Sequence, residues 1–183
     1  MALAQSSILE TGSPASAFTL PDTRNGQAVS PDDFAGQALV IAFICNHCPY
    51  VVHLIDTFTQ VAHDLASQGV ATIAISANDA SQYPADSPEN MGKLAIDKGF
   101  KFPYCHDESQ AVARAYSAVC TPDIYLFDAE HTLYYRGQFD GSRPGSGTAT
   151  GADLSQAVAQ LFNQQPPPQN PPPSVGCSIK WKP

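Results

Sequence analysis

The sequence predicts an α/β domain in which helices flank a central mixed β-sheet. Two apolar runs, residues 38–44 and 70–76, contain no charged side chain and are typical of strands covered on both faces. Between them, apolar residues recur at steps of three and four from Val51 to Leu65, the spacing of a helix with one buried face. Alternation of strand and helix along the rest of the chain indicates the same fold class.

The first half of the chain supplies a hairpin, two strands and two helices. Residues 17–30 are expected to form an N-terminal β-hairpin around an Asn-Gly turn, because this pair tolerates the positive φ of tight hairpins. The helix after strand 38–44 begins at a cysteine pair and ends at Gly69, and strand 70–76 follows. A loop rich in Pro, Ser and Asp then leads to a helix at about residues 89–98.

The second half predicts a short helix, a strand pair and a final helix. The helix fits residues 109–118, and residues 123–128 and 132–138 are expected to pair around a turn at residues 129–131. The last helix covers residues 151–162 and carries apolar residues on one face.

Beyond this helix the composition changes. Residues 164–173 contain six prolines and are expected to be extended polyproline, which neither continues a helix nor pairs as a strand. We therefore expect one domain at 1–163, a proline-rich linker at 164–173 and a C-terminal tail segment at 174–183. A chain of 183 residues fits a single domain with appendages.

The charge balance restricts the partners. A net charge of −8 and a pI near 4.8 would repel phosphate backbones and anionic lipid surfaces, so neither nucleic acid nor a membrane is expected as a partner. The first ten residues lack the cationic and apolar segments of an export signal, which favours a cytoplasmic location. Nothing in the sequence indicates the oligomeric state, and no cofactor is expected.

Five cysteines, at positions 45, 48, 105, 120 and 177, form an odd set in a chain without an export signal. This argues against a structural disulfide framework and leaves redox chemistry or metal binding to explain any special thiol. Cys105 follows an apolar Phe-Pro-Tyr and is expected to be a buried small hydrophobe.

The Cys45-Asn46-His47-Cys48 motif lies where a buried strand meets the first turn of a helix. Free backbone N–H groups and the helix dipole stabilise negative charge there, and a protonated His47 would add to the effect. Two intervening residues let the sulfurs close a disulfide without large backbone movement. The motif therefore predicts a dithiol that exchanges with disulfides, with half of a zinc site as the alternative.

The chain also resembles the thioredoxin superfamily, and within it the peroxiredoxin-like redoxin branch (alkyl hydroperoxide reductase and thiol-specific antioxidant). The motifs that carry the resemblance are Cys-Asn-His-Cys-Pro-Tyr at residues 45–50, Gly-x-x-Ala-x-x-Phe-x-Leu-x-Asp at 12–22, Thr-Pro at 121–122 and Gly-Cys-Ser-Ile-Lys-Trp at 176–181. The resemblance implies a thioredoxin-like fold over residues 1–163. It also implies that Pro122 is a cis-proline, that Thr121 and Pro122 face the cysteine pair where an incoming peptide can pair, and that Cys120 approaches the pair.

Three positions depart from the patterns of these families. With the peroxiredoxin reactive cysteine aligned to Cys48, Ile41 stands at the usual proline and Cys45 at the usual threonine, while Pro122 replaces an arginine. Strand 38–44 also lacks the buried acidic residue of many thioredoxins. The departures at Ile41, Cys45 and Pro122 argue against peroxide reduction as the main activity. The lack of a buried acidic residue leaves proton transfer to water or to His47.

Two assignments of the pair remain open. In a thioredoxin-like mechanism Cys45, expected to be the more exposed sulfur, attacks the substrate disulfide and Cys48 resolves the mixed disulfide. In a peroxiredoxin-like mechanism Cys48 is oxidised to a sulfenic acid and Cys45 condenses with it. The substrate would be a protein disulfide or a small thiol or peroxide, and an external thiol would be the reductant.

The remaining candidates are accessory. Cys177 could relay electrons as a third thiol, or it could only pack while the apolar residues around it dock the tail in a groove. A rival interpretation is a copper- or zinc-binding module built from Cys45, Cys48 and His47, with Cys120 or Cys177. The other histidines receive no role, since two lie off the apolar face of the first helix and two lie in expected loops: His53, His63, His106 and His131.

Overall fold

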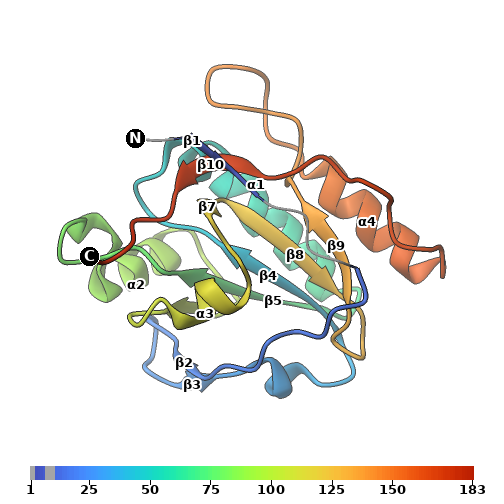
Figure 1. Ribbon diagram of the computed structural model, residues 1–183, viewed down its shortest axis with the longest axis horizontal. Coiled ribbons are helices and arrows are strands. Elements are labelled where there is room, and N and C mark those ends of the chain that lie inside the picture. Colours follow the sequence, from blue (N-terminus) through green and yellow to red (C-terminus); the bar gives the residue numbers. More distant parts are fainter. Residues whose placement is uncertain (1–2, 7–10) are drawn as a thin grey trace.

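A five-stranded mixed sheet forms the centre of the computed structural model, which describes residues 3–6 and 11–183 (Figure 1). Its strand order is β6-β5-β4-β8-β9. The neighbours β4, β5 and β6 are parallel, whereas β8 is antiparallel to both β4 and β9. The strands are β4 (Ala38–Phe43), β5 (Val70–Ser76), β6 (Tyr104–His106), β8 (Asp123–Phe127) and β9 (Leu133–Gly137). The α/β class with a mixed sheet is confirmed, while positions 1–2 and 7–10 of the expected domain lie outside the described residues.

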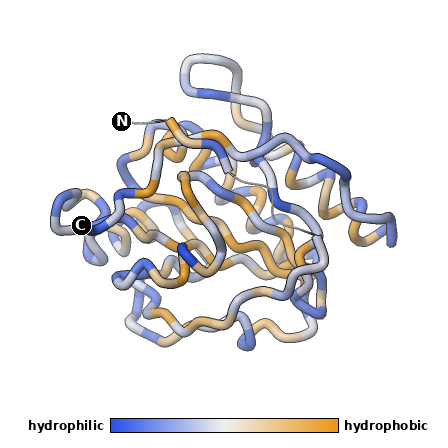
Figure 2. The backbone as a smooth tube through the Cα atoms, in the orientation of Figure 1, coloured by the Kyte–Doolittle hydropathy of each residue, from blue (hydrophilic) through white to orange (hydrophobic). Residues whose placement is uncertain are grey.

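Helices cover both faces of this sheet, because alternate residues of β4 point to opposite sides. Val40 and Ala42 pack with α1 (Pro49–Ala66), α2 (Pro88–Asp97) and α4 (Ala152–Phe162). Leu39 and Ile41 pack on the other face with α3 (Ala111–Ala115) and the N-terminal segment. The apolar strands accordingly lie inside and the polar loops outside (Figure 2).

The N-terminal hairpin is present but short. Strands β2 (Leu20–Pro21) and β3 (Ala28–Val29) pair antiparallel around Gly26, whose φ of 74° fits the expected turn. Two single turns of 3-10 helix complete the described helices of the first half: η1 (Pro31–Phe34) and η2 (Pro84–Asp86).

Two sequence predictions in the second half are wrong in detail. The helix expected at residues 109–118 spans only α3, because Gln110 and Ser117 adopt left-handed backbone conformations with φ of 62° and 51° on either side of it. His106, expected in a loop, lies in β6, a three-residue strand too short to show a periodic pattern.

The C-terminal tail forms an unpredicted strand. In a second sheet of order β1-β10-β7, β10 (Val175–Ser178) lies antiparallel between β1 (Leu3–Gln5) and β7 (Cys120–Thr121). The tail thus crosses back over the domain to the start of α1, runs beside β1 as β10 and ends near α2 (Figure 1). Among the helices of residues 3–6 and 11–183, none is long and apolar enough to cross a bilayer.

Candidate active site

The cysteine pair lies at the junction of β4 and α1. Cys48 is the N-cap of α1, and Pro49 occupies the first helical position, where its missing N–H costs no hydrogen bond. The Thr121–Pro122 peptide bond is cis, as the resemblance implied, and this segment faces the pair. The structure thus brings together the five residues expected at the reacting centre: Cys45, His47, Cys48, Thr121 and Pro122.

Thr121 contacts both sulfurs. Its hydroxyl oxygen Oγ1 lies 3.3 Å from Cys45 Sγ, and its carbonyl oxygen lies 3.1 Å from Cys48 Sγ. The two cysteine side chains are also hydrogen-bonded to each other. The pair is a reduced dithiol in which one proton can be shared between the sulfurs.

The surroundings favour Cys48 as the ionised sulfur. The hydrogen bonds from the side chains of Cys45 and Cys177, together with the backbone N–H groups of Val51 and Cys177, outweigh burial and lower the pKa of Cys48 to about 4. The Thr121 carbonyl opposes a negative charge there, but the donors outnumber it. The hydrogen bond with Cys48, burial and the nearby Asp86 raise the pKa of Cys45 well above its ordinary value, against a smaller lowering effect of Thr121.

The expected difference in exposure between the two sulfurs is negligible in the structure. Cys45 is 1% exposed and Cys48 is 0% exposed, so both thiols are enclosed. The sequence could not show this, because the cover includes β10, which packs on the start of α1 from the far end of the chain. β10 also occupies the edge of β7 next to Pro122 that the resemblance assigns to an incoming peptide.

Asp86 is a site residue that sequence reasoning missed. Its side chain is fully buried, and its Oδ2 lies 2.6 Å from His47 Nδ1. Oδ1 accepts a hydrogen bond from the backbone N–H of Asn46 (2.8 Å), and Oδ2 accepts one from the Asn78 side chain (2.8 Å). Tyr83 stacks on the His47 ring at 5.2 Å. A buried carboxylate is therefore close to the pair after all, although it comes from η2 rather than from β4.

No local pattern distinguishes Asp86 in the sequence. It stands in a loop with several other acidic and polar residues, where a solvated carboxylate is the ordinary expectation. Only the packing of η2 against the cysteine loop buries it. The inference that proton transfer falls to water or His47 alone therefore overlooked Asp86.

The three remaining cysteines differ in their relation to the pair. Cys177 on β10 is buried and hydrogen-bonded to Cys48. Cys120 lies close by, but its sulfur is 3.6 Å from the carbonyl of Pro122, and burial strongly raises its pKa. Cys105 lies in the core on the opposite face of the central sheet, where burial raises its pKa to about 12. The expectation of a small buried hydrophobe describes Cys105 well.

The tail beyond Cys177 is docked, as the packing alternative proposed. Ile179 is 3% exposed and belongs to the core under α3, and Trp181 packs against the same core. The guanidinium carbon of Arg114 lies 4.4 Å from the Trp181 ring centroid. Docking and contact with the pair are thus compatible, because Cys177 does both.

The histidines of α1 are less solvated than expected. His53 Nε2 lies 2.9 Å from Ser142 Oγ, and its side chain lines a small hollow with Tyr50 and Pro122. His63 is half-buried beside Phe102. Neither contacts the cysteine pair in any described interaction.

A potential metal-ligand set differs from the one expected. The ligand atoms of Cys45, His47 and Asp86 lie within 4.8 Å of one another, so a sulfur, an imidazole nitrogen and a carboxylate oxygen converge. The sequence-based set used sulfur from Cys48 and the accessory cysteines instead. In the structure the His47 and Asp86 atoms bond to each other, an arrangement that a metal would have to replace.

Comparisons with known proteins concern the family and the fold of the chain. The AhpC/TSA family model matches residues 11–136. A crystal structure of an uncharacterized conserved protein from Geobacillus kaustophilus is 46% identical, with a TM-score of 0.96, over 100% of this chain and 98% of that one. A hypothetical protein from Sinorhizobium meliloti 1021 is 43% identical, with a TM-score of 0.93, over 97% and 98% of the two chains.

A more distant similarity concerns the fold alone. The thioredoxin domain of a thiol-disulfide oxidoreductase from Bacteroides vulgatus has a TM-score of 0.62 at 21% identity and covers 82% of this chain and 99% of that one. The thioredoxin-like fold is therefore confirmed. No curated protein matches the chain.

Proposed function

From the premise that this chain belongs to the AhpC/TSA family, whose model matches most of its length, we propose that it is a thiol-disulfide oxidoreductase. Its working group is the dithiol of Cys45 and Cys48, which alternates between reduced and disulfide forms. An external thiol returns the oxidised pair to the dithiol.

One observation carries this proposal. Two hydrogen-bonded cysteines lie at the start of α1, and Thr121 contacts both sulfurs from the other side. Amide N–H groups at a helix start stabilise a thiolate, which is the reactive form in disulfide exchange. The pair therefore combines an activated sulfur with a second sulfur ready to close the disulfide.

The environment supports a reaction that begins at Cys48. Its thiolate attacks one sulfur of the substrate disulfide, and the other substrate sulfur leaves as a thiolate. Cys45 then loses its proton and attacks Cys48 Sγ, so that the second substrate sulfur is released and a Cys45–Cys48 disulfide forms. The dithiol thus gives two electrons to the substrate. The His47–Asp86 pair lies close enough to Cys45 to receive its proton.

This order reverses the roles expected from the sequence, so the test is a comparison of two variants. We expect the double variant Cys45→Ser/Cys177→Ser, which lacks both thiols that contact Cys48, to form a stable mixed disulfide with a small aromatic disulfide at neutral pH, and Cys48→Ser to react much more slowly. Intact-mass analysis with time reports both rates. A fast mixed disulfide through Cys45 in Cys48→Ser would restore the thioredoxin-like order. Failure of both variants and of the wild-type chain to react would contradict the proposal.

Peroxide reduction is the second candidate, and the ionised Cys48 favours it. The resemblance aligns this sulfur with the peroxiredoxin reactive cysteine, and its pKa is lowered to about 4. Attack on a peroxide oxygen would give a Cys48 sulfenic acid and an alcohol or water, and condensation with Cys45 would release water and form the same disulfide. The absent arginine and proline argue against efficient peroxide binding. Consumption of an organic hydroperoxide with dithiothreitol as reductant distinguishes this activity from disulfide exchange.

A further inference from the structure

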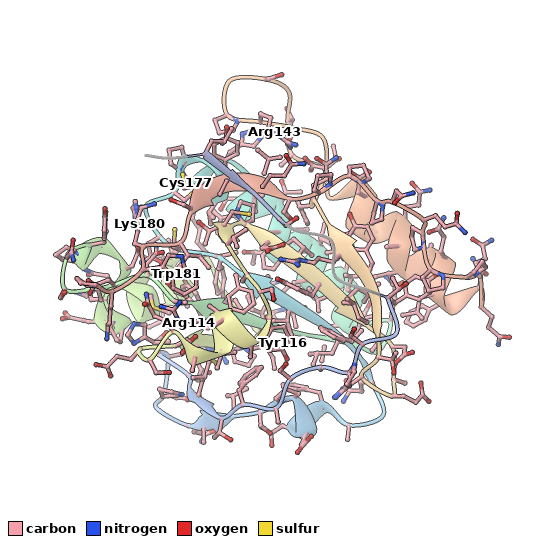
Figure 3. The ribbon with its side chains drawn as sticks, viewed as in Figure 1. Arg114, Tyr116, Arg143, Cys177, Lys180 and Trp181 are labelled. Carbon is pink, nitrogen blue, oxygen red and sulfur yellow. The ribbon has the colours of Figure 1, made fainter. Side chains whose placement is uncertain are left out.

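β10 brings a third thiol into contact with the pair. Cys177 stands opposite Thr121 in the antiparallel pairing of β10 with β7, and Thr121 is the residue that contacts both Cys45 and Cys48. The side chain of Cys177 is hydrogen-bonded to Cys48. Figure 3 shows Cys177 on β10 at the end of the sheet where β7 begins.

The backbone of the tail is built for this close approach. A Cβ at Gly176 would overlap the carbonyl oxygen of Thr121 and lie 2.7 Å from its carbonyl carbon, so a larger residue does not fit there. Beyond Cys177, the N–H of Ile179 donates to a carbonyl of the segment before β7, and the N–H of Lys180 donates to the Asn78 side chain at 2.8 Å. The thiol is therefore held in place on both sides.

The other nearby cysteine is oriented differently. Cys120 and Thr121 are neighbours on β7, so their side chains point to opposite faces of the strand. The sulfur of Cys120 lies beside the carbonyls of Pro122 and Ser174, at 3.6 and 3.9 Å. Of these two cysteines, Cys177 is therefore the one whose side chain contacts the pair.

We propose that Cys177 is a third redox thiol of this centre, which forms a disulfide with Cys48 in exchange for Cys45. The step rests on the proposed function, because substrate must first oxidise the pair. Cys177 Sγ attacks Cys48 Sγ of the Cys45–Cys48 disulfide, the bond between Cys45 and Cys48 breaks, and Cys45 takes up the proton that Cys177 loses. One disulfide exists before and after, so no further oxidant or reductant is needed.

The pKa of Cys177 depends on whether Cys48 is reduced or in a disulfide. Burial and the neighbouring Cys48 raise the pKa of Cys177 to about 12 while Cys48 is reduced, and Lys180 acts in the opposite direction. When Cys48 enters a disulfide, its charge and its hydrogen bond to Cys177 disappear, and Cys177 ionises more readily. Oxidation of the pair thus removes the two effects of Cys48 that keep Cys177 protonated, while the effect of burial remains. Transfer to Cys177 keeps Cys48 in a disulfide and returns Cys45 to the reduced form.

The test uses the full chain and a variant that removes the competing partner. We oxidise Cys45→Ser with one equivalent of hydrogen peroxide, alkylate free thiols and map the tryptic peptides. Cys48 lies in the peptide of residues 25–93, Cys177 in that of residues 137–180, and Cys105 and Cys120 in two others. The expected product links peptides 25–93 and 137–180 in most molecules. Cys105→Ser in the same background should give the same linkage.

Two results would overturn the inference. One is a Cys48 sulfinic acid or an intermolecular Cys48 disulfide with Cys177 fully alkylated, and the other is a linkage from Cys48 to Cys120. If Cys45→Ser does not fold, Cys45→Ala and partial reduction of the oxidised wild-type chain give the same peptide readout. Failure of the proposed function has a separate signature, because the wild-type chain would then form no Cys45–Cys48 disulfide.

Discussion

His47 Nδ1 lies 2.6 Å from Oδ2 of the fully buried Asp86, and an imidazole nitrogen and a carboxyl oxygen of these two residues lie within 4.8 Å of Cys45 Sγ. This contact places an imidazole ring and a carboxyl group beside the cysteine that ionises less readily. It joins the cysteine loop to η2, two segments 39 residues apart in the chain. The contact explains how a carboxylate reaches the centre although β4 contains no acidic residue.

Asp86→Asn should make Cys45 more reactive. The Asp86 charge raises the pKa of Cys45, so its removal increases the thiolate fraction at neutral pH. In a Cys48→Ser background we expect alkylation of Cys45 at pH 7 to accelerate roughly tenfold, the effect of one pKa unit. Asp79→Asn is the matched control, because Asp79 is buried in the same loop but bonds to Ser81. An unchanged or slower rate in Asp86→Asn would contradict the assignment.

The thiolate of Cys48 should persist to acid pH. Its pKa falls from an ordinary 9.0 to about 4 on folding, so the thiolate absorbance of the reduced protein near 240 nm should hold from pH 8 to pH 5 and fall through pH 4. Cys48→Ser should lack this transition. Because the folded-state pKa is the lower one, ionisation stabilises the folded chain fully above pH 9, and this contribution is lost as the pH falls towards 4. A transition near pH 8 or 9 would contradict the assigned thiolate.

Thr121→Val should make Cys45 less reactive. The variant keeps the shape of the side chain but removes the hydroxyl 3.3 Å from Cys45 Sγ, which lowers the pKa of Cys45. A neutral hydrogen bond contributes about 0.5–1.5 kcal/mol, so alkylation of Cys45 in a Cys48→Ser background should slow by roughly two- to tenfold. Thr72→Val serves as control, since the Thr72 hydroxyl is buried without a hydrogen-bond partner among the described residues. Equal rates in the two variants would show that the hydroxyl does not act on the sulfur.

Gly176→Ala should loosen the tail and uncover the pair. The added methyl overlaps the Thr121 carbonyl, which belongs to the backbone and cannot rotate away. We expect the free energy of unfolding in urea to fall by about 1–3 kcal/mol, the range for overpacked sites, and alkylation of Cys48 and Cys177 to accelerate. Gly141→Ala is the control, because the nearest atom to its Cβ would be 3.9 Å away. Identical behaviour of the two variants would show that β10 is not held against β7 at Gly176.

Local patterns predicted the central strands and the first helix. The apolar runs placed β4 and β5 to within one residue, since a strand buried on both faces must be apolar throughout. The three- and four-residue spacing placed α1, and its start at Cys48 followed from the motif. The resemblance supplied the cis bond before Pro122, which no local pattern indicated.

The sequence by itself determined the fold class, the dithiol at the start of a helix and the proximity of Thr121 to it, because these follow from short-range patterns and one family motif. Only the tertiary structure decided which sulfur is the ionised one, that a carboxylate from η2 lies beside Cys45, and that the tail carries Cys177 to Cys48. The physical reason is that these properties depend on contacts between residues far apart in the sequence. Burial, charge and hydrogen bonding at a sulfur depend on every segment packed around it, and here those segments come from η2, β7 and β10, far apart in the chain.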